Sequence, residues 1–348
     1  MARSASTAGG AVPTAAAVSA PRWQKVPRVL GRLSSAEVGL VINEADPYSV
    51  AVGEHYIRAR QIAPGRVLRV SLPRQPQLSP ADLERLREQI AARFDATVQA
   101  LALAWVEPYA VSCQSITAAV TLGLDPTLCR HTCGKASASA LFNSASSAPF
   151  RDHGLRPSML LAAPDLAQAL ALIDRGVAAD RSLGWLGSPP SHAWFLSTGD
   201  VARNVRAALF PPPGPIARPA LQVHVERADQ LFDKSGIVML QTGLARLWPL
   251  ESLQFVPGAL ADHLTSFGGA LGDARGQTSA LAWIAAGATA SYGTVSEPCN
   301  HQQKFPHPQL LLLHYAQGAT AIEAYWKSVA WPAQGVFIGE PLAAPFAR

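Results

Sequence analysis

Residues 38–42 read Val-Gly-Leu-Val-Ile, a short apolar run typical of a strand that is buried on both faces of a parallel sheet. The turn-forming residues 43–47 follow at once, and Ser49 is placed to cap a helix that continues to about Arg60. Residues 66–72 then have the composition of a second strand. This first unit predicts a strand, a helix and a strand in succession.

The same alternation continues along the chain. Ser79-Pro80 is typical of a helix start, with serine as the N-cap and proline at the first helical position. Residues 101–105 form a third apolar run. Strands that alternate with helices favour right-handed crossovers, so we expect an α/β fold with a mostly parallel central sheet flanked by helices on both faces. The apolar stripe of the second helix is expected at Leu83, Leu86, Ile90 and Phe94.

The second half of the chain resumes the pattern after a long irregular stretch. Residues 107–157 lack regular periodicity, and a loop of this length is usually functional. Asp200 is expected to cap a helix, and Thr320 with Glu323 forms a capping box. We expect a flexible leader at 1–35 and a single domain at 36–348 with an insertion at about 107–160. Strands are expected at 194–196, 221–225, 237–240, 254–260, 288–295 and 336–338, and helices at 166–177, 200–209, 278–286, 308–317 and from 320 onward.

The composition is that of a well-buried globular protein, with 49% hydrophobic and 15% charged residues in 348. The net charge is +5, but no run of five Lys or Arg residues occurs, so a nucleic-acid partner is disfavoured. No stretch of 18 apolar residues occurs, so we expect no integral membrane segment. Residues 8–20 resemble a weak export signal that ends in Val-Ser-Ala, which predicts a periplasmic or secreted protein; a disordered leader on a cytoplasmic protein is the alternative.

Polar residues that follow the predicted strands are the candidate site, because ligands bind parallel sheets outside the carboxyl ends of the strands. The most distinctive segment is 261–269, Ala-Asp-His-Leu-Thr-Ser-Phe-Gly-Gly. His263 beside Asp262 could be a general base, and the two glycines would let a ligand approach the backbone closely. Alternatively, His263 caps a loop and the glycines form a turn. The ligand-binding candidates are Asn43, Asp46, Thr265, Ser266, Gly268, Gly269, Glu297 and His301.

Cysteine supplies a second candidate group. Cys299 follows another predicted strand and, with a nearby histidine, could be a thiolate nucleophile. A buried or disulfide-bonded cysteine is the commoner case, and the four cysteines form an even set that an exported protein can pair. A metal site from Asp262, His263, Glu297 and His301 has no recognisable ligand spacing, so none is expected. No phosphate loop, dinucleotide fingerprint or nucleophile elbow occurs, so we expect no cofactor.

The C-terminal third resembles gingipain-like cysteine peptidases. Residues 287–298, Gly-Ala-Thr-Ala-Ser-Tyr-Gly-Thr-Val-Ser-Glu-Pro, resemble the part of those enzymes that follows the catalytic strand. Residues 323–326, Glu-Ala-Tyr-Trp, and 339–342, Gly-Glu-Pro-Leu, occupy the matching later places. The resemblance implies a caspase-like, three-layer α/β sandwich and a peptidase-like hydrolase activity.

Over residues 37–345 the chain is more similar to a family of uncharacterised bacterial proteins with the same architecture. Members of that family often carry export signals, which favours the export prediction for residues 1–20. The motifs that carry this similarity are Asn43-x-x-Asp46-Pro47-x-Ser49, Ser115-Ile116-Thr117, Arg156-Pro157-Ser158-Met159, Asp262-His263-Leu264-Thr265-Ser266 and Lys304-Phe305-Pro306.

The sequence departs from the gingipain pattern at the catalytic positions. Those peptidases carry a His-Gly pair after one strand and the nucleophilic cysteine after the next, whereas here 241–243 read Gln-Thr-Gly and 262–263 read Asp-His. Neither catalytic residue carries over, and two hypotheses follow. A hydrolase with a rearranged site would use His263 and Cys299. A catalytically inactive caspase-like scaffold would instead bind a peptide or a small molecule in the same cleft.

Overall fold

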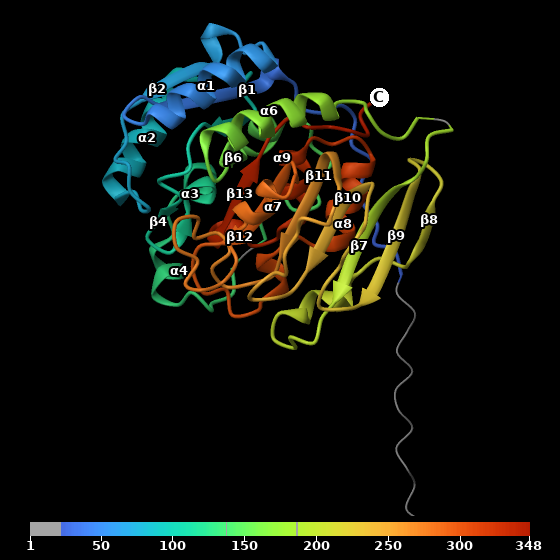
Figure 1. The fold of residues 1–348 in the computed structure, drawn as a ribbon. Coiled ribbons are helices and arrows are strands. Elements are labelled where there is room, and N and C mark those ends of the chain that lie inside the picture. The colour runs from blue at the N-terminus through green and yellow to red at the C-terminus, as the bar shows by residue number, and fades with distance from the viewer. Residues whose placement is uncertain (1–21, 137, 186) are drawn as a thin grey trace, which may run out of the picture.

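The computed structural model describes residues 22–136, 138–185 and 187–348, and an 11-stranded sheet runs through them (Figure 1). The strand order is β2-β1-β3-β6-β13-β12-β11-β10-β7-β9-β8, and β4 pairs with β5 in a separate hairpin. The strands are β1 (Val38–Asn43), β2 (Val67–Val70), β3 (Ala100–Leu103), β4 (Ala110–Val111), β5 (Gln114–Ser115), β6 (Ser158–Leu160), β7 (Ser191–Ser197), β8 (Gly214–Ile216), β9 (Leu221–Arg227), β10 (Ile237–Thr242), β11 (Phe255–His263), β12 (Ala290–Thr294) and β13 (Gly335–Gly339). The α-helices are α1 (Pro47–Arg60), α2 (Pro80–Arg93), α3 (Ile116–Leu122), α4 (Pro126–Arg130), α5 (Pro149–His153), α6 (Leu166–Ala179), α7 (Leu281–Ala285), α8 (Pro308–Ala316) and α9 (Ala321–Ser328).

Helices cover both faces of the sheet. A Cβ added to Gly53 of α1 would collide with Ile42, and one added to Gly39 would collide with Phe94 at the end of α2. Ile42 and Gly39 are three residues apart on β1, so they face opposite sides of the pleat. Helix α6 packs on α1 and β11, whereas α3 and α9 pack on β13. The predicted α/β class, with a mostly parallel sheet between two helical layers, is confirmed.

The sheet is mostly parallel, with β13 antiparallel to β12 near its middle and β8 antiparallel to β9 at one end. β13 is antiparallel to β12 over five residue pairs, whereas one pair, Ile338 with Leu160, joins β13 to β6, and β6 is parallel to β3. On the other side of this junction, β11, β10, β7 and β9 are parallel to β12. The segments that follow β3 and β12 meet, since Ser296 Oγ donates to Cys113 O at 2.7 Å, and Glu340, beside the start of β12, pairs with Arg60 at the end of α1. The carboxyl ends of β1, β3 and β6 therefore lie at the same edge as those of β10, β11 and β12. The parallel strands thus end at one edge, as expected from the sequence, whereas β13 runs in the opposite direction and ends at the other edge.

Capping chemistry was predicted in part. Ser79 accepts a hydrogen bond from Asp82 N and caps α2 as expected, and the Thr320–Glu323 capping box begins α9. The cap of α1 is Asp46 rather than Ser49, because Asp46 Oδ1 accepts from Tyr48 N at 3.1 Å. The helix expected at 200–209 is a 3₁₀ helix, η3, over Asn204–Leu209, and the one expected at 278–286 is shortened to α7.

The stretch 107–157, expected to be irregular, contains the buried helix α3. The Ser115 side chain caps this helix and also donates to Gly335 O at 2.5 Å, at the start of β13. α3 packs on both β6 and β13. Its composition of small and β-branched residues hid the helix, because a helix that is buried nearly all round shows no amphipathic period.

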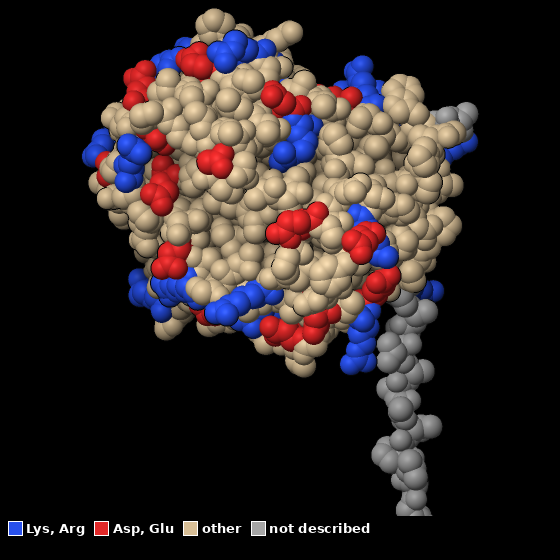
Figure 2. All heavy atoms as spheres, in the orientation of Figure 1, with Lys and Arg blue, Asp and Glu red and all other residues tan. Residues whose placement is uncertain are grey.

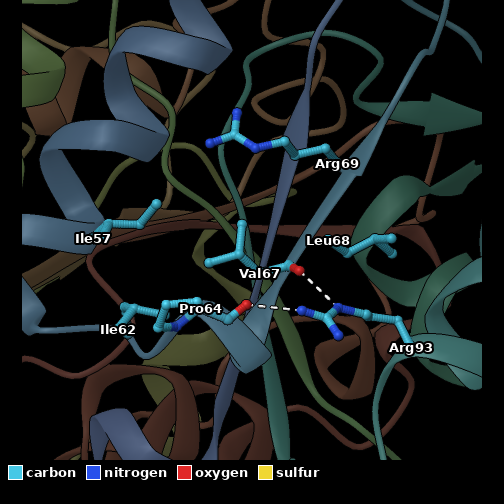
Figure 3. Close-up of a pocket in the computed structure, with 7 residues that line it drawn as sticks. All are labelled: Ile57, Ile62, Pro64, Val67, Leu68, Arg69 and Arg93. Atoms are coloured by element: carbon cyan, nitrogen blue, oxygen red, sulfur yellow. Dashed lines mark hydrogen bonds between the residues drawn. The ribbon is translucent and has the colours of Figure 1, made fainter.

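The sheet edge at β2 is covered by an arginine. Arg93 Nε donates to Val67 O at 2.8 Å, and Arg93 Nη2 donates to Pro64 O at 2.7 Å (Figure 3). Ile57, Ile62 and Leu68 line the shallow hollow of about 490 Å³ around it. Unpaired carbonyl groups on an edge strand invite pairing with another chain, and the guanidinium satisfies one of them, Val67 O, here.

No helix in the described part of the chain is long and apolar enough to cross a membrane, in line with the prediction from the sequence. The proposed signal segment, residues 8–20, lies outside the described residues. On the face shown in Figure 2, Lys and Arg side chains are interspersed with Asp and Glu.

Candidate functional site

Asp262 lies near the end of β11 and is fully buried. Its Oδ1 pairs with Arg206 Nη1 at 2.5 Å, and its Oδ2 accepts from Gln241 Nε2 at 2.8 Å. Burial raises the pKa of Asp262, and the Arg206 guanidinium and the Gln241 amide act in the opposite direction. Both carboxylate oxygens are thus engaged by protein groups, which makes Asp262 one half of a buried ion pair rather than an exposed acid.

Arg206 comes from η3 and joins three segments of the chain. Besides Asp262, it donates to Thr242 O at 2.8 Å and to Pro306 O at 3.2 Å. The guanidinium thereby ties the ends of β10 and β11 to the segment that leads into α8. The planar fork of arginine suits this multiple contact. Sequence reasoning missed Arg206, since nothing local marks an arginine in a 3₁₀ turn as the partner of a carboxylate 56 residues away.

His263 is the last residue of β11 and is only 1% exposed. Trp283 Nε1 donates to His263 Nδ1 at 3.0 Å, so the ring proton lies on Nε2, which donates to Thr278 O at 3.0 Å. Burial, the largest cause, lowers the pKa of His263 to about 3. The ring is held neutral with both nitrogens occupied. This geometry does not support the predicted role of general base, which needs a free nitrogen that reaches a substrate.

His263 should make the protein less stable in acid. Its folded-state pKa of about 3 lies below the unfolded value of about 6.5, so the unfolded chain binds the proton first as the pH falls. The contribution is complete above about pH 6.5 and declines toward pH 3 by about 1.4 kcal/mol per pH unit. The free energy of unfolding, measured in urea at several pH values, should fall with pH at this slope. His263→Gln should lower the slope by the contribution of one proton, about 1.4 kcal/mol per pH unit. Equal slopes in the two proteins would contradict it.

Cys299 is bonded to Cys133, and Cys113 is bonded to Cys129, so all four cysteines of the sequence are paired. A sulfur in a disulfide is not a thiolate, and the prediction of Cys299 as the nucleophile is therefore wrong for this structure. His301, which was expected to assist, bonds through Nε2 to Cys133 O at 2.9 Å. Glu297 Oε1 accepts from Cys299 N at 2.8 Å. These residues form a cross-linked loop, not a Cys–His dyad.

The two glycines of segment 261–269 are explained by packing. A Cβ on Gly269 would lie 2.3 Å from Gly293 O, so the backbone of this segment lies directly against β12. Gly269 N donates to Thr294 O at 2.9 Å, and Thr294 Oγ1 donates to Ser266 O at 3.0 Å. The close approach that the glycines permit is to the chain itself. They also form a turn, in which Ala270 N donates to Phe267 O at 3.0 Å, as the alternative prediction had it.

Thr265 lies at the rim of this edge. Its hydroxyl donates to Gln277 Oε1 at 2.6 Å and accepts from Arg203 Nε at 3.2 Å. Arg203 also pairs with Asp200 at 2.9 Å, and both side chains are about a quarter exposed. Arg203 and Gln277 were not predicted. They lie in loops that come to this edge only through the fold.

Asn43 and Asp46 lie at the carboxyl end of β1, and in the strand order β3, β6, β13 and β12 separate β1 from β11, which precedes Thr265. The Asn43 side chain donates to Leu72 O at 3.2 Å and accepts from Leu72 N at 2.9 Å, which clamps the loop after β2. Asp46 caps α1. The structure therefore does not bring these two candidates together with the others.

An apolar cavity of about 520 Å³ lies beside His263. Thr278, whose carbonyl accepts from His263, is one of its lining residues, and Trp248 packs edge-on against Trp283 beneath it. This cavity could not be predicted from the sequence, because its apolar residues follow the same pattern as those of the core. Trp248, Leu250, Leu253 and Ala282 line it together with Ala285 and Ala286. Within the described ranges, no group of three or more His, Cys, Asp or Glu side chains is arranged to hold a metal ion.

Comparison with known proteins gives a match at the level of structure only. No protein-family model matches the sequence, and no curated protein matches it. The chain is similar to the crystal structure of gingipain R, an Arg-specific cysteine proteinase, with 12% identity, a TM-score of 0.44, and coverage of 89% of this chain and 78% of gingipain R. It is also similar to a complex of the pro- and mature domains of RgpB from Porphyromonas gingivalis, with 10% identity, a TM-score of 0.43, and coverage of 90% and 80%. Both are structures of gingipain, the family that the sequence resemblance names.

Proposed function

We propose that this chain is a catalytically inactive scaffold that binds a peptide. The observation that carries the proposal is the state of the two residues on which catalysis would depend. His263 has both ring nitrogens bonded to Trp283 and Thr278, and Cys299 is bonded to Cys133. A hydrolase of the thiol type needs a thiolate next to an accessible base, and these contacts offer neither.

The apolar cavity beside His263 supports binding. Its volume of about 520 Å³ falls in the range of small-ligand sites, and its lining is mainly aliphatic and aromatic. One acidic side chain, Glu251, and the hydroxyl of Thr278 are its polar groups. A cavity of this kind accepts an apolar side chain, while nearby polar groups can bond to a peptide backbone. We therefore place the peptide over Thr278 and Trp248.

The two disulfides support a further part of the proposal, namely that the protein is exported. Disulfides persist in the periplasm and outside the cell, and they are rare in the reducing cytosol. The Cys133–Cys299 bond connects segments that are 166 residues apart in the sequence, whereas Cys113–Cys129 spans 16 residues. Both lie at the edge of the sheet where β12 ends.

The proposal predicts binding without turnover. Incubation with a library of short peptides, followed by mass spectrometry, should show no cleavage above the level seen with His263→Gln. The same library should contain peptides with a bulky apolar residue that raise the melting temperature. Ala285→Trp, which places a large side chain in the cavity from the exposed end of α7, should abolish that shift.

The matched control is Ala171→Trp, the same change at an exposed position of α6. It should leave the peptide-induced shift as in the wild type. Cleavage that is lost in His263→Gln while the circular dichroism spectrum is retained would overturn the proposal in favour of a hydrolase. A thermal shift that persists in Ala285→Trp would move the binding site elsewhere.

A further inference from the structure

We propose a second ligand site, for a small organic anion with an apolar body, in the cavity that is lined by Arg181, Arg218 and Arg348. This cavity has a volume of about 620 Å³. It lies near the amino ends of β7 and β9, away from the edge that carries Thr265 and His263. The site is thus independent of the peptide-binding proposal.

The walls of the cavity come from three parts of the chain that are held together by backbone hydrogen bonds. Arg181 N donates to Ala344 O at 3.1 Å, and Leu183 N donates to Pro345 O at 3.0 Å. These bonds join the loop after α6 to the last residues of the chain, next to the C mark in Figure 1. Arg218 lies on the loop before β9 and forms the third wall. The cavity is therefore part of the folded structure and not a gap beside a loose end.

The positive charge of the lining residues favours an anionic ligand in this cavity. Three arginine residues are among those that line it, and no Asp or Glu residue is. None of the three arginines takes part in any of the ion pairs found among the described residues. Asp180, the acidic residue next to Arg181, pairs with Arg60 instead. Like charges that share a cavity repel one another, and a bound carboxylate, phosphate or sulfonate would relieve this repulsion with bidentate hydrogen bonds.

The apolar part of the ligand follows from the remaining lining. Trp185 is 64% exposed, which is unusual for so large an aromatic side chain, and its Nε1 donates to Arg181 O at 2.6 Å. This bond satisfies the polar atom of the indole and leaves the ring for stacking. Leu183, Pro219 and Phe346 complete the apolar surface. Aromatic rings beside guanidinium groups suit a planar or aliphatic body that ends in an anionic group.

The test uses two fluorescent probes that differ in charge. Anilinonaphthalene sulfonate is an apolar anion, and N-phenylnaphthylamine is its neutral counterpart. We expect the double variant Arg181→Gln/Arg218→Gln to bind the sulfonate about tenfold more weakly than the wild type and the neutral probe equally well. Trp185→Ala should weaken both probes, because it removes apolar surface without changing the charge. The wild-type affinity for the sulfonate should also fall with added salt.

Two controls locate the effect. The double variant Arg58→Gln/Arg227→Gln removes the same charge at exposed positions, one on α1 and one at the opposite end of β9 from Arg218, and should bind both probes as the wild type does. Ala285→Trp, which fills the cavity beside His263, should retain the Arg-dependent part of sulfonate binding. An unchanged affinity in Arg181→Gln/Arg218→Gln, or an equal loss in the charge control, would overturn the proposal. Urea unfolding of each variant confirms that the protein is folded.

Discussion

Asp262→Ala should lower the free energy of unfolding by about 3–5 kcal/mol, because it leaves a buried guanidinium without its carboxylate. Arg206 is as buried as Asp262, and the remaining groups around it are the carbonyls of Thr242 and Pro306. Carbonyl dipoles offset only part of the cost of burying a full charge. Urea unfolding at neutral pH, with the slope against denaturant compared between variants, measures the loss.

The matched control is Asp200→Ala, which removes the same side chain from the pair with Arg203, in which both side chains are about a quarter exposed. That pair is screened by solvent, and its loss should cost less than about 1 kcal/mol. The double variant Asp262→Leu/Arg206→Met should recover most of the stability lost in Asp262→Ala, since two apolar side chains need no charge partner. A loss in Asp262→Ala no greater than that in Asp200→Ala would show that the buried pair does not hold this edge together.

The Cys133–Cys299 disulfide should contribute more to stability than any single hydrogen bond in the protein. It closes a loop of 166 residues, and its removal restores that freedom to the unfolded chain. Chain-entropy arguments assign about 5 kcal/mol to a loop of this length. We expect Cys133→Ser/Cys299→Ser to unfold at a correspondingly lower denaturant concentration.

The comparison variant is Cys113→Ser/Cys129→Ser, which opens a loop of only 16 residues. The same arguments assign about 3 kcal/mol to that loop, so its loss should be the smaller of the two. A larger loss in the short-loop variant would refute the entropic account. Alkylation of the wild type under native conditions, followed by intact mass measurement, should add no label, in contrast to a thiol at Cys299 that is free to react.

Much of the fold could be read from the sequence. The strands at 38–42 and 237–240, the α2 helix with its Ser79 cap and the Thr320–Glu323 capping box are local features, and each was predicted close to its observed place. Local patterns succeed here because hydrophobic periodicity and capping hydrogen bonds act within one or two turns of chain. The misses in secondary structure, which include β6, α3 and the 3₁₀ form of η3, are short elements whose form depends on what packs against them.

The candidate site could be predicted only as a list of polar residues near strand ends. Whether those residues meet depends on the order of the strands, and β3, β6, β13 and β12 lie between β1, which precedes Asp46, and β11, which precedes Thr265. The partners that define the state of the site, Arg206 for Asp262 and Trp283 for His263, come from other segments.

The sequence by itself determined an α/β chain with polar residues and two glycines at 262–269, since composition and periodicity are properties of the local chain. Only the tertiary structure decided what those residues do. It buried His263 between Trp283 and Thr278, paired Cys299 with Cys133 and gathered Arg181, Arg218 and Arg348 around one cavity. The physical reason is that protonation, thiol state and charge clustering depend on neighbours in space, which are supplied by segments far apart in the chain.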